Sequence, residues 1–271
     1  MRPLVALLRF PGVNCEFETA RALHCGGAGV EWIEWGRRLD EGAFQGFVVP
    51  GGFSYEDRVR AGAVASRSEW VDALARAADR GKPVLGICNG AQVLVESGLV
   101  PGGEGHPVRL ALARNGGSGA GGYLCRWTYV EVGAAAPGWL SALAGTRWPV
   151  PVAHGEGRFT SRDAEVRAAV ESGNLGAVRY VGPDGSPAGD SAWDPNGSLG
   201  AAAGACDARG VALALMPHPE RAAWLRQVPQ DMDGPWGERR RLARTAAELM
   251  SPGPGQAIFD AFVRGARDAA R

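Results

Sequence analysis

The sequence of 271 residues lacks the patterns that most directly indicate a zinc centre or a disulfide framework. It has four histidines, none in a His-x-His or His-Glu-x-x-His spacing, and five scattered cysteines without a Cys-x-x-Cys pair. Neither a zinc site nor a set of disulfides is therefore expected. An excess of one charge is also missing, because 29 basic residues balance 29 acidic ones. This balance argues against a protein that binds nucleic acid or an anionic membrane.

Long apolar runs are absent as well. The first run, at 4–8, is broken by Arg9 and Pro11, too early for a signal peptide. No stretch reaches the ~20 apolar residues of a membrane span. We therefore expect a cytoplasmic protein with reduced thiols. The chain also lacks a G-x-x-x-x-G-K-[ST] phosphate loop, so it offers no recognisable ATP site of its own.

Short apolar runs, bounded by glycine or proline, alternate with segments of helical periodicity. They are apolar throughout, as strands covered on both faces are. We predict strands at 4–10, 30–35, 47–50, 83–88, 123–132, 150–153, 177–181 and 211–216. We predict helices at about 14–25 (with Asn14 as N-cap), 66–80, 91–97, 163–171, 238–250 and 256–270. This alternation predicts an α/β fold of flavodoxin-like type, with a doubly wound, mostly parallel sheet flanked by helices.

The predicted strands continue on both sides of a glycine-rich stretch at 102–122, which we interpret as a surface loop. The sequence therefore predicts a single domain over 1–271. From about residue 222, an irregular segment that contains proline precedes the last two predicted helices. We expect this part to form a C-terminal helical extension.

Cys88 lies where a predicted strand turns sharply into a helix, with Gly86 and Gly90 two residues to either side. This is the pattern of a nucleophile elbow, in which glycines let strand and helix approach closely. The positive end of the following helix favours a thiolate. The alternative is a buried structural thiol, and this is our interpretation of the other four cysteines, including Cys15 in the turn after the first strand.

A thiol nucleophile needs a group that accepts its proton and later protonates the leaving amine. His218 follows the predicted strand at 211–216 and lies between two prolines, which favour an extended backbone. Residues i and i+2 of an extended segment face the same side, so Glu220 can orient His218 as the third member of a triad. His154 also follows a predicted strand and is the alternative base. We rank it second and place it on the substrate side of the pocket.

The predicted strand at 47–50 ends in Gly51 and Gly52. Backbone amides there, with the amide of Asn89, would stabilise the oxyanion of a tetrahedral acyl intermediate. Pro-Gly-Gly is a common turn, so this interpretation depends on the cysteine elbow and the His-Pro-Glu segment. The three segments together predict an acyl-transfer site.

These segments resemble the class I, or triad, glutamine amidotransferases: Pro50-Gly51-Gly52, Gly86-Ile87-Cys88-Asn89-Gly90-Ala91-Gln92 and His218-Pro219-Glu220, in that order. More narrowly, the chain resembles the family of glutaminase subunits of phosphoribosylformylglycinamidine synthase, an enzyme of purine biosynthesis. That resemblance runs through 9–16, 51–55, 60–62, Asn115 with 125–127, 153–158, 195–198 and 216–221.

The resemblance implies that Cys88 attacks the side-chain amide of glutamine, releases ammonia and leaves a γ-glutamyl thioester that water hydrolyses. It also implies that Gly52 and Asn89 donate to the oxyanion and that Gln92 helps to seat glutamine. The ammonia would pass to a large synthetase subunit, which uses ATP and Mg²⁺ to convert formylglycinamide ribonucleotide to formylglycinamidine ribonucleotide. A small accessory subunit often bridges the two. No cofactor is expected in this chain itself.

The sequence departs from that family at a few positions outside the triad. Glu56 stands where glycine is usual, Arg58-Val59 replaces an aromatic-aliphatic pair, and Ala91 replaces a larger residue. The tail after Arg221 is longer than in compact members.

Two other classes of function are alternatives. One is a free-standing cysteine hydrolase of similar fold, such as a γ-glutamyl hydrolase or a PfpI-like peptidase, but the PfpI-like pattern has histidine directly after the nucleophile, where this chain has Asn89. The other is a catalytically silent scaffold subunit. Loss of a triad residue would indicate it, and Cys88, His218 and Glu220 are all present.

Overall fold

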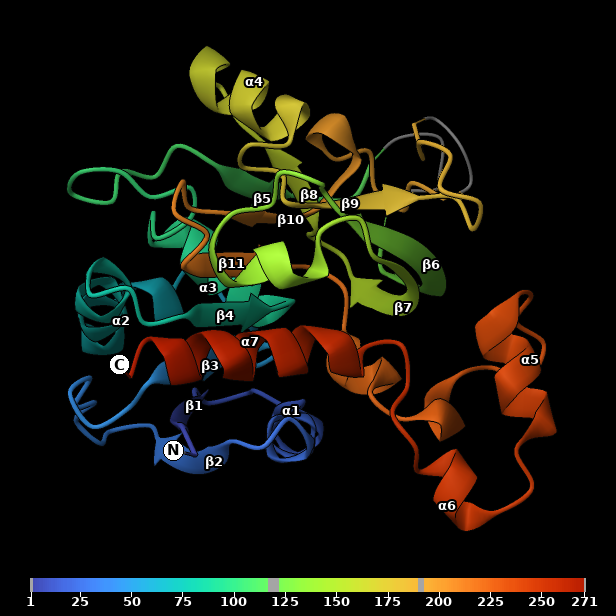
Figure 1. The fold of residues 1–271 in the computed structure, drawn as a ribbon. Coiled ribbons are helices and arrows are strands. Elements are labelled where there is room, and N and C mark those ends of the chain that lie inside the picture. Colours follow the sequence, from blue (N-terminus) through green and yellow to red (C-terminus); the bar gives the residue numbers. More distant parts are fainter. Residues whose placement is uncertain (1, 117–121, 190–192, 271) are drawn as a thin grey trace.

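The computed structural model describes residues 2–116, 122–189 and 193–270. Its centre is a nine-stranded sheet in the order β2-β1-β3-β4-β11-β10-β9-β6-β7, and β5 and β8 form a separate pair (Figure 1). The strands are β1 Leu4–Arg9, β2 Gly29–Glu34, β3 Gly46–Val49, β4 Val84–Ile87, β5 Ala111–Ala113, β6 Leu124–Val132, β7 Arg147–His154, β8 Arg158–Thr160, β9 Val178–Val181, β10 Ala202–Cys206 and β11 Ala212–Leu215.

One half of the sheet is parallel and the other is antiparallel. Strands β2, β1, β3, β4 and β11 run parallel to one another. From β11 through β10, β9 and β6 to β7, each strand is antiparallel to the next. All residues of β3, β4 and β11 are buried, as expected where helices cover both faces. The carboxyl ends of β3, β4 and β11 therefore meet at one edge, where the site is found.

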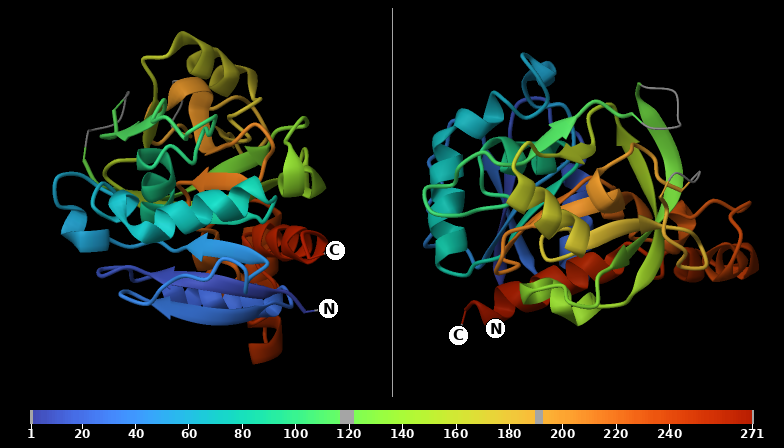
Figure 2. Two further views of the ribbon diagram at one scale, coloured as in Figure 1. Left: turned by 90° about the vertical axis from the view of Figure 1, so that its left-hand side faces the viewer. Right: turned by 90° about the horizontal axis from the view of Figure 1, so that it is seen from above.

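Helices lie on both faces of the sheet. They are α1 Glu16–Cys25, α2 Glu69–Asp79, α3 Asn89–Glu96, α4 Ala164–Ser172, α5 Pro235–Leu242, α6 Ala246–Leu249 and α7 Gln256–Asp268. Helices α1 and α7 pack together on one face, and α2 and α3 cover the other (Figure 2). Helix α7 buries Ile258, Phe259 and Phe262, a spacing that places them on one side of the helix. The predicted α/β sheet flanked by helices is confirmed.

Short 3₁₀ helices connect several of these elements. They are η1 Ser54–Asp57, η2 Ala65–Arg67, η3 Gly138–Leu143, η4 Leu199–Ala201, η5 Pro219–Ala222 and η6 Leu225–Gln227. Helices α5 and α6 lie to one side of the sheet, away from α2 (Figure 1). Within the described ranges, no helix is both long enough and apolar enough to cross a membrane.

The eight predicted strands are all present, but three strands were not predicted. Strands β5 and β8 have three residues each, too few for a visible pattern, and β5 falls within the stretch expected to be a loop. Residues 117–121 of that stretch lie outside the described residues. Strand β10 consists of small residues with low strand propensity. It forms because β9 and β11 pair with both its edges, which overrides the local preference.

Several helix boundaries also differ from the prediction. The N-cap of α1 is Cys15, not Asn14, and no side chain caps this helix; the Asn14 side chain instead accepts a hydrogen bond from the Cys15 thiol. The helix predicted at 66–80 begins at Glu69, after a 3₁₀ turn. The helix predicted at 238–250 is two helices, α5 and α6, because the chain turns at Ala243, which has extended angles.

Candidate active site

Cys88 is the single residue between the end of β4 and the start of α3. Its backbone has φ 49° and ψ −104°, a conformation that is strained for a residue with a side chain. Glycines make the turn possible: a Cβ on Gly90 would lie 1.9 Å from the carbonyl oxygen of Val49, and one on Gly86 would lie 2.5 Å from that of Gly90. The predicted sharp turn from strand to helix at Cys88 is therefore present. The Cys88 side chain is 5% exposed, and its thiol contacts the carbonyl oxygen of Ala153 at 3.6 Å.

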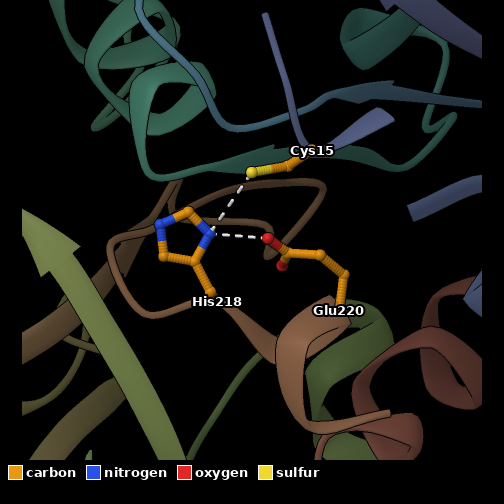
Figure 3. Close-up of side chains that lie close together, drawn as sticks. All are labelled: Cys15, His218 and Glu220. Atoms are coloured by element: carbon orange, nitrogen blue, oxygen red, sulfur yellow. Dashed lines mark hydrogen bonds and ion pairs between the residues drawn. The ribbon is translucent and has the colours of Figure 1, made fainter. Parts of the chain in front are cut away.

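His218 and Glu220 form a buried pair beyond the end of β11. The Nδ1 atom of His218 lies 2.5 Å from Oε1 of Glu220, and the side chains are 4% and 0% exposed (Figure 3). The backbone geometry that produces this contact differs from the prediction. Only His218 has a non-helical backbone, with φ −105° and ψ 83°, whereas Glu220 lies in the 3₁₀ helix η5, which begins at Pro219. A tight turn, not an extended segment, brings the pair together.

The charges around His218 favour its protonated form. Burial lowers the pKa of His218, but the negative charges of Glu220 and Cys88 raise it, as do hydrogen bonds to Cys15 and Cys88, and the result is a pKa well above its usual value. A protonated imidazole next to a thiolate is the resting state that a cysteine nucleophile with a histidine partner requires.

The surroundings of His154 favour its neutral form. Burial lowers its pKa to about 4, and the nearby charge of His218 adds to this effect. Its Nδ1 lies 3.1 Å from Oδ1 of Asn115, and that oxygen can only accept, so Nδ1 carries the proton. The Nε2 atom is then an acceptor, and it has no hydrogen-bond partner among the described residues. A neutral imidazole with so low a pKa is a poor base, which favours the substrate-side position over the catalytic one.

A cleft of about 190 Å³ opens beside Cys88, and we call it the Cys88 cleft. Besides Cys88 itself, three of the residues singled out in the sequence line it: Gly52, Gln92 and His154. Gly51 does not line it; a Cβ on Gly51 would lie 2.8 Å from the His218 ring. Asn89 does not line it either; its side chain is buried and hydrogen-bonded to Ser54 and Gln92.

The remaining lining residues were not predicted as site residues. They are Phe53, Asp57, Ala61, Tyr123, Ala153, Gly155 and Glu156. Phe53 and Tyr123 stack with their ring centroids 6.4 Å apart at the mouth, where they are 44% and 57% exposed. Burial, followed by the charge of Glu156, raises the pKa of Asp57, so the two carboxyl groups lie close enough to repel each other. Phe53, Ala61, Ala153, Gly155 and Glu156 lie in segments that carried the resemblance, whereas Asp57 and Tyr123 lie outside them, and no sequence signal pointed to these two.

Hydrogen bonds connect the two sides of the Cys88 cleft. The Gln92 side chain donates to the carbonyl oxygen of Glu156 at 2.7 Å and accepts from Asn89 Nδ2 at 2.9 Å. Asn89 Nδ2 also donates to Asp57 at 3.2 Å, and its Oδ1 accepts from the backbone amide of Ser54 at 3.0 Å. These bonds fix the first turn of α3 relative to both sides.

Two backbone amides are available next to the thiol. The N–H groups of Gly52 and Asn89 donate to no acceptor in the described part of the chain. Asn89 is the first residue of α3, where the amide of a helix is unpaired. Free amides near a nucleophile can stabilise a developing oxyanion.

Cys15, His218 and Glu220 also place a thiol, a ring nitrogen and a carboxylate within 4.8 Å of one another (Figure 3). These atoms already have hydrogen-bond partners. His218 and Glu220 share a short bond, and the guanidinium of Arg221 contacts the Cys15 sulfur at 3.2 Å. A fixed positive charge against a ligand atom opposes a bound cation, so the cluster fits a hydrogen-bonded support for the imidazole better than a metal centre.

Comparison with known proteins defines the class. Residues 2–260 match the family model of the CobB/CobQ-like glutamine amidotransferase domain. The chain therefore belongs to the glutamine amidotransferases, the family to which its elbow, buried His-Glu pair and fold all correspond.

Its relatives narrow the group further. The chain is 38% identical to the phosphoribosylformylglycinamidine synthase subunit PurQ of Methanothrix thermoacetophila, over 96% of this chain and 97% of that one. It is 41% identical to the protein of the same name from Thermomicrobium roseum, over 80% and 86% of the two chains. Among solved structures, a chain of PurLQS from Thermotoga maritima matches with a TM-score of 0.71 and 29% identity, over 97% of this chain and 99% of that chain.

Proposed function

We infer that the chain is the glutaminase subunit of a phosphoribosylformylglycinamidine synthase. It hydrolyses glutamine and passes ammonia to a synthetase subunit, which aminates formylglycinamide ribonucleotide at the expense of ATP. The observation that carries this inference is the buried His218–Glu220 pair beside a strained cysteine turn, in a chain that matches PurQ subunits along almost its whole length. The partners are then a large synthetase subunit and a small accessory subunit, as the composition of the related PurLQS structure supports.

We propose Cys88, His218 and Glu220 as the catalytic residues. The Cys88 thiolate attacks the Cδ atom of glutamine, and the amide oxygen becomes an oxyanion that the amides of Gly52 and Asn89 stabilise. His218 donates its proton to the departing nitrogen, so that ammonia leaves and a γ-glutamyl thioester remains. Water then attacks the thioester, neutral His218 accepts a proton from it, and glutamate leaves as the thiolate re-forms. Glu220 stabilises each protonated state of His218.

The Cys88 cleft has groups that suit the α-amino end of glutamine. Asp57 and Glu156 supply negative charge that suits the α-ammonium group of the substrate, and a cation between them would relieve their mutual repulsion. His154 Nε2 adds an uncharged acceptor. In this proposal Gln92 acts by holding the loop of Glu156 in place, since both ends of its amide are occupied by protein groups.

The organisation of the chain and its setting are also proposals. We propose that 1–271 forms one amidotransferase domain with a helical extension from about residue 222, supported by the continuous nine-stranded sheet. We propose that the protein is cytoplasmic. It needs no cofactor for glutamine hydrolysis, because the thiol and water are the two nucleophiles of that reaction and the imidazole, oriented by the carboxylate, transfers its protons, and ATP and Mg²⁺ serve the synthetase subunit.

The test compares glutamine with ammonia as the nitrogen donor in the complex of this chain with its cognate synthetase subunits. Cys88→Ala should abolish glutamine-dependent synthesis and leave ammonia-dependent synthesis unchanged, whereas Cys25→Ala, at an exposed thiol, should change neither. Equal loss of both activities in Cys88→Ala would mean that Cys88 is structural. Rapid hydrolysis of peptides or polyglutamates without a partner would instead indicate a free-standing hydrolase.

A further inference from the structure

A second buried thiol lies behind the catalytic histidine. The sulfur of Cys15 is 3.9 Å from Nδ1 of His218, the same nitrogen that contacts Glu220 (Figure 3). Cys15 is 1% exposed and directly precedes α1, so it approaches His218 from a different element than Cys88 does. The reaction proposed above does not use this thiol.

The Cys15 sulfur is held by defined contacts. Arg221 donates to it through Nη2 at 3.2 Å, and the thiol donates to Oδ1 of Asn14 at 3.2 Å. The backbone of Cys15 is fixed as well, because its amide donates to the carbonyl oxygen of Gly51 and its own carbonyl oxygen accepts from Thr19. The position of the sulfur is therefore determined by the fold.

The same contacts leave the imidazole little freedom. A Cβ on Gly51 would lie 2.8 Å from Cε1 of His218 and 3.2 Å from the Cys15 sulfur, so backbone, ring and thiol are in close packing. Arg221 Nε also lies 4.0 Å from Glu220 Oε1. The Arg221 guanidinium thus contacts the Cys15 thiol and lies beside the Glu220 carboxylate. These are the two groups that face Nδ1 of His218.

We propose that Cys15, held by Arg221, is a positioning residue that keeps the His218 ring in the orientation needed for proton transfer at Cys88. The proposal rests on the glutaminase function inferred above. The sulfur limits rotation of the ring away from Glu220, and its contact with Nδ1 at 3.9 Å favours the protonated imidazole. Serine keeps a small polar atom at this position, whereas alanine removes it and leaves a space beside Nδ1.

The experiment uses the complex with the synthetase subunits and compares Cys15→Ala, Cys15→Ser and the wild type. Cys206→Ala is the matched control, because Cys206 is fully buried in β10 and its replacement also removes an internal sulfur. For each variant, kcat and KM for glutamine, the rate with ammonia, the pH profile of kcat/KM and the midpoint of thermal unfolding are measured.

Cys15→Ala should lower the glutamine-dependent kcat about ten-fold, the loss typical of removing a group that orients a catalytic ligand, with KM and the ammonia rate unchanged. The alkaline limb of its pH profile should move to lower pH, because the protonated imidazole loses a stabilising contact. Cys15→Ser should restore kcat to within about two-fold, and Cys206→Ala should change only stability.

Each contrary result overturns a distinct statement. If Cys15→Ala keeps the wild-type kcat and pH profile, or loses glutamine and ammonia activities equally, Cys15 is structural. If Cys15→Ser is as impaired as Cys15→Ala, a polar atom at this position does not support catalysis, and the proposed positioning role of Cys15 is wrong. If the wild-type complex uses ammonia but not glutamine, the proposed glutaminase function is wrong, and the proposed role of Cys15 is then wrong as well.

Discussion

Replacing Glu220 by glutamine tests the charge balance of the site most directly. Glutamine has nearly the same shape and its oxygen can still accept from Nδ1–H of His218, so the change removes the charge and keeps the contact. In the wild type, burial lowers the pKa of His218 and the charge of Glu220 is the first of the effects that raise it. Without that charge, less remains to offset the effect of burial, which disfavours the protonated ring, so the pKa of His218 falls.

The size of the effect follows from the contact. The bond is 2.5 Å long between side chains that are 4% and 0% exposed, so solvent screens it little. A hydrogen bond to a charged group contributes about 1.5–3 kcal/mol and a neutral one about 0.5–1.5. Their difference, ~1–1.5 kcal/mol, corresponds to a loss of roughly 5- to 13-fold in the glutamine-dependent kcat/KM, since 1.36 kcal/mol is tenfold.

The assay is synthesis by the complex with glutamine and then with ammonia, over a range of pH. In the proposed mechanism the active form pairs a thiolate with a protonated His218, so activity should end where His218 loses its proton. Glu220→Gln should therefore move the alkaline limb of the glutamine profile to lower pH and leave the ammonia reaction unchanged. Glu41→Gln is the control, because Glu41 also pairs with a cation, Arg76, but precedes β3 at the opposite edge of the sheet. A loss below two-fold, or an unmoved limb, would refute the reasoning.

Two further predictions concern substrate binding and the elbow. Glu156→Gln should raise KM for glutamine several-fold with little change in kcat, because a partly exposed charge pair contributes up to about 1 kcal/mol. Glu165→Gln, on the exposed surface of α4, is the control. An equal effect on the analogue glutaramate, which lacks the α-amino group, would contradict the proposed contact between Glu156 and that group. Gly90→Ala should destabilise the fold by about 3 kcal/mol or more, since its Cβ would overlap the carbonyl oxygen of Val49. Gly133→Ala, where the nearest atom is 3.7 Å away, should be tolerated in the same thermal unfolding measurement, and similar midpoints for the two variants would show that the close approach is not needed.

The sequence allowed accurate prediction where local pattern and tertiary structure agree. The elbow at Cys88 was predictable because its glycines and the change from apolar strand to helix are visible within a few residues. The pairing of His218 with Glu220 was predicted correctly, but by the wrong geometry, since a proline can start a 3₁₀ turn as readily as it can hold a segment extended. Strand β10 was missed because its pairing partners, not its own residues, determine its conformation.

The unpredicted residues of the site come from loops that are distant in the sequence. Asp57 and Glu156 meet at the Cys88 cleft only because β3 and β7 end on the same side of the sheet. Cys15 looked like an ordinary structural thiol, and its contact with His218 links positions 203 residues apart. Sequence spacing contains no information about such contacts, which only the complete sheet brings about.

The hydrogen bonds of Gln92 and Asn89 have a mechanical consequence. They form one continuous path from the loop of Glu156, through the first turn of α3, to the loop of Asp57 and Ser54. Displacement of either loop therefore shifts the peptide that bears the Asn89 amide, immediately after the nucleophile. In the proposed mechanism, a protein that docks on one of these loops therefore has a direct physical route to the Asn89 amide, and thus to match the release of ammonia to the moment when it can be used.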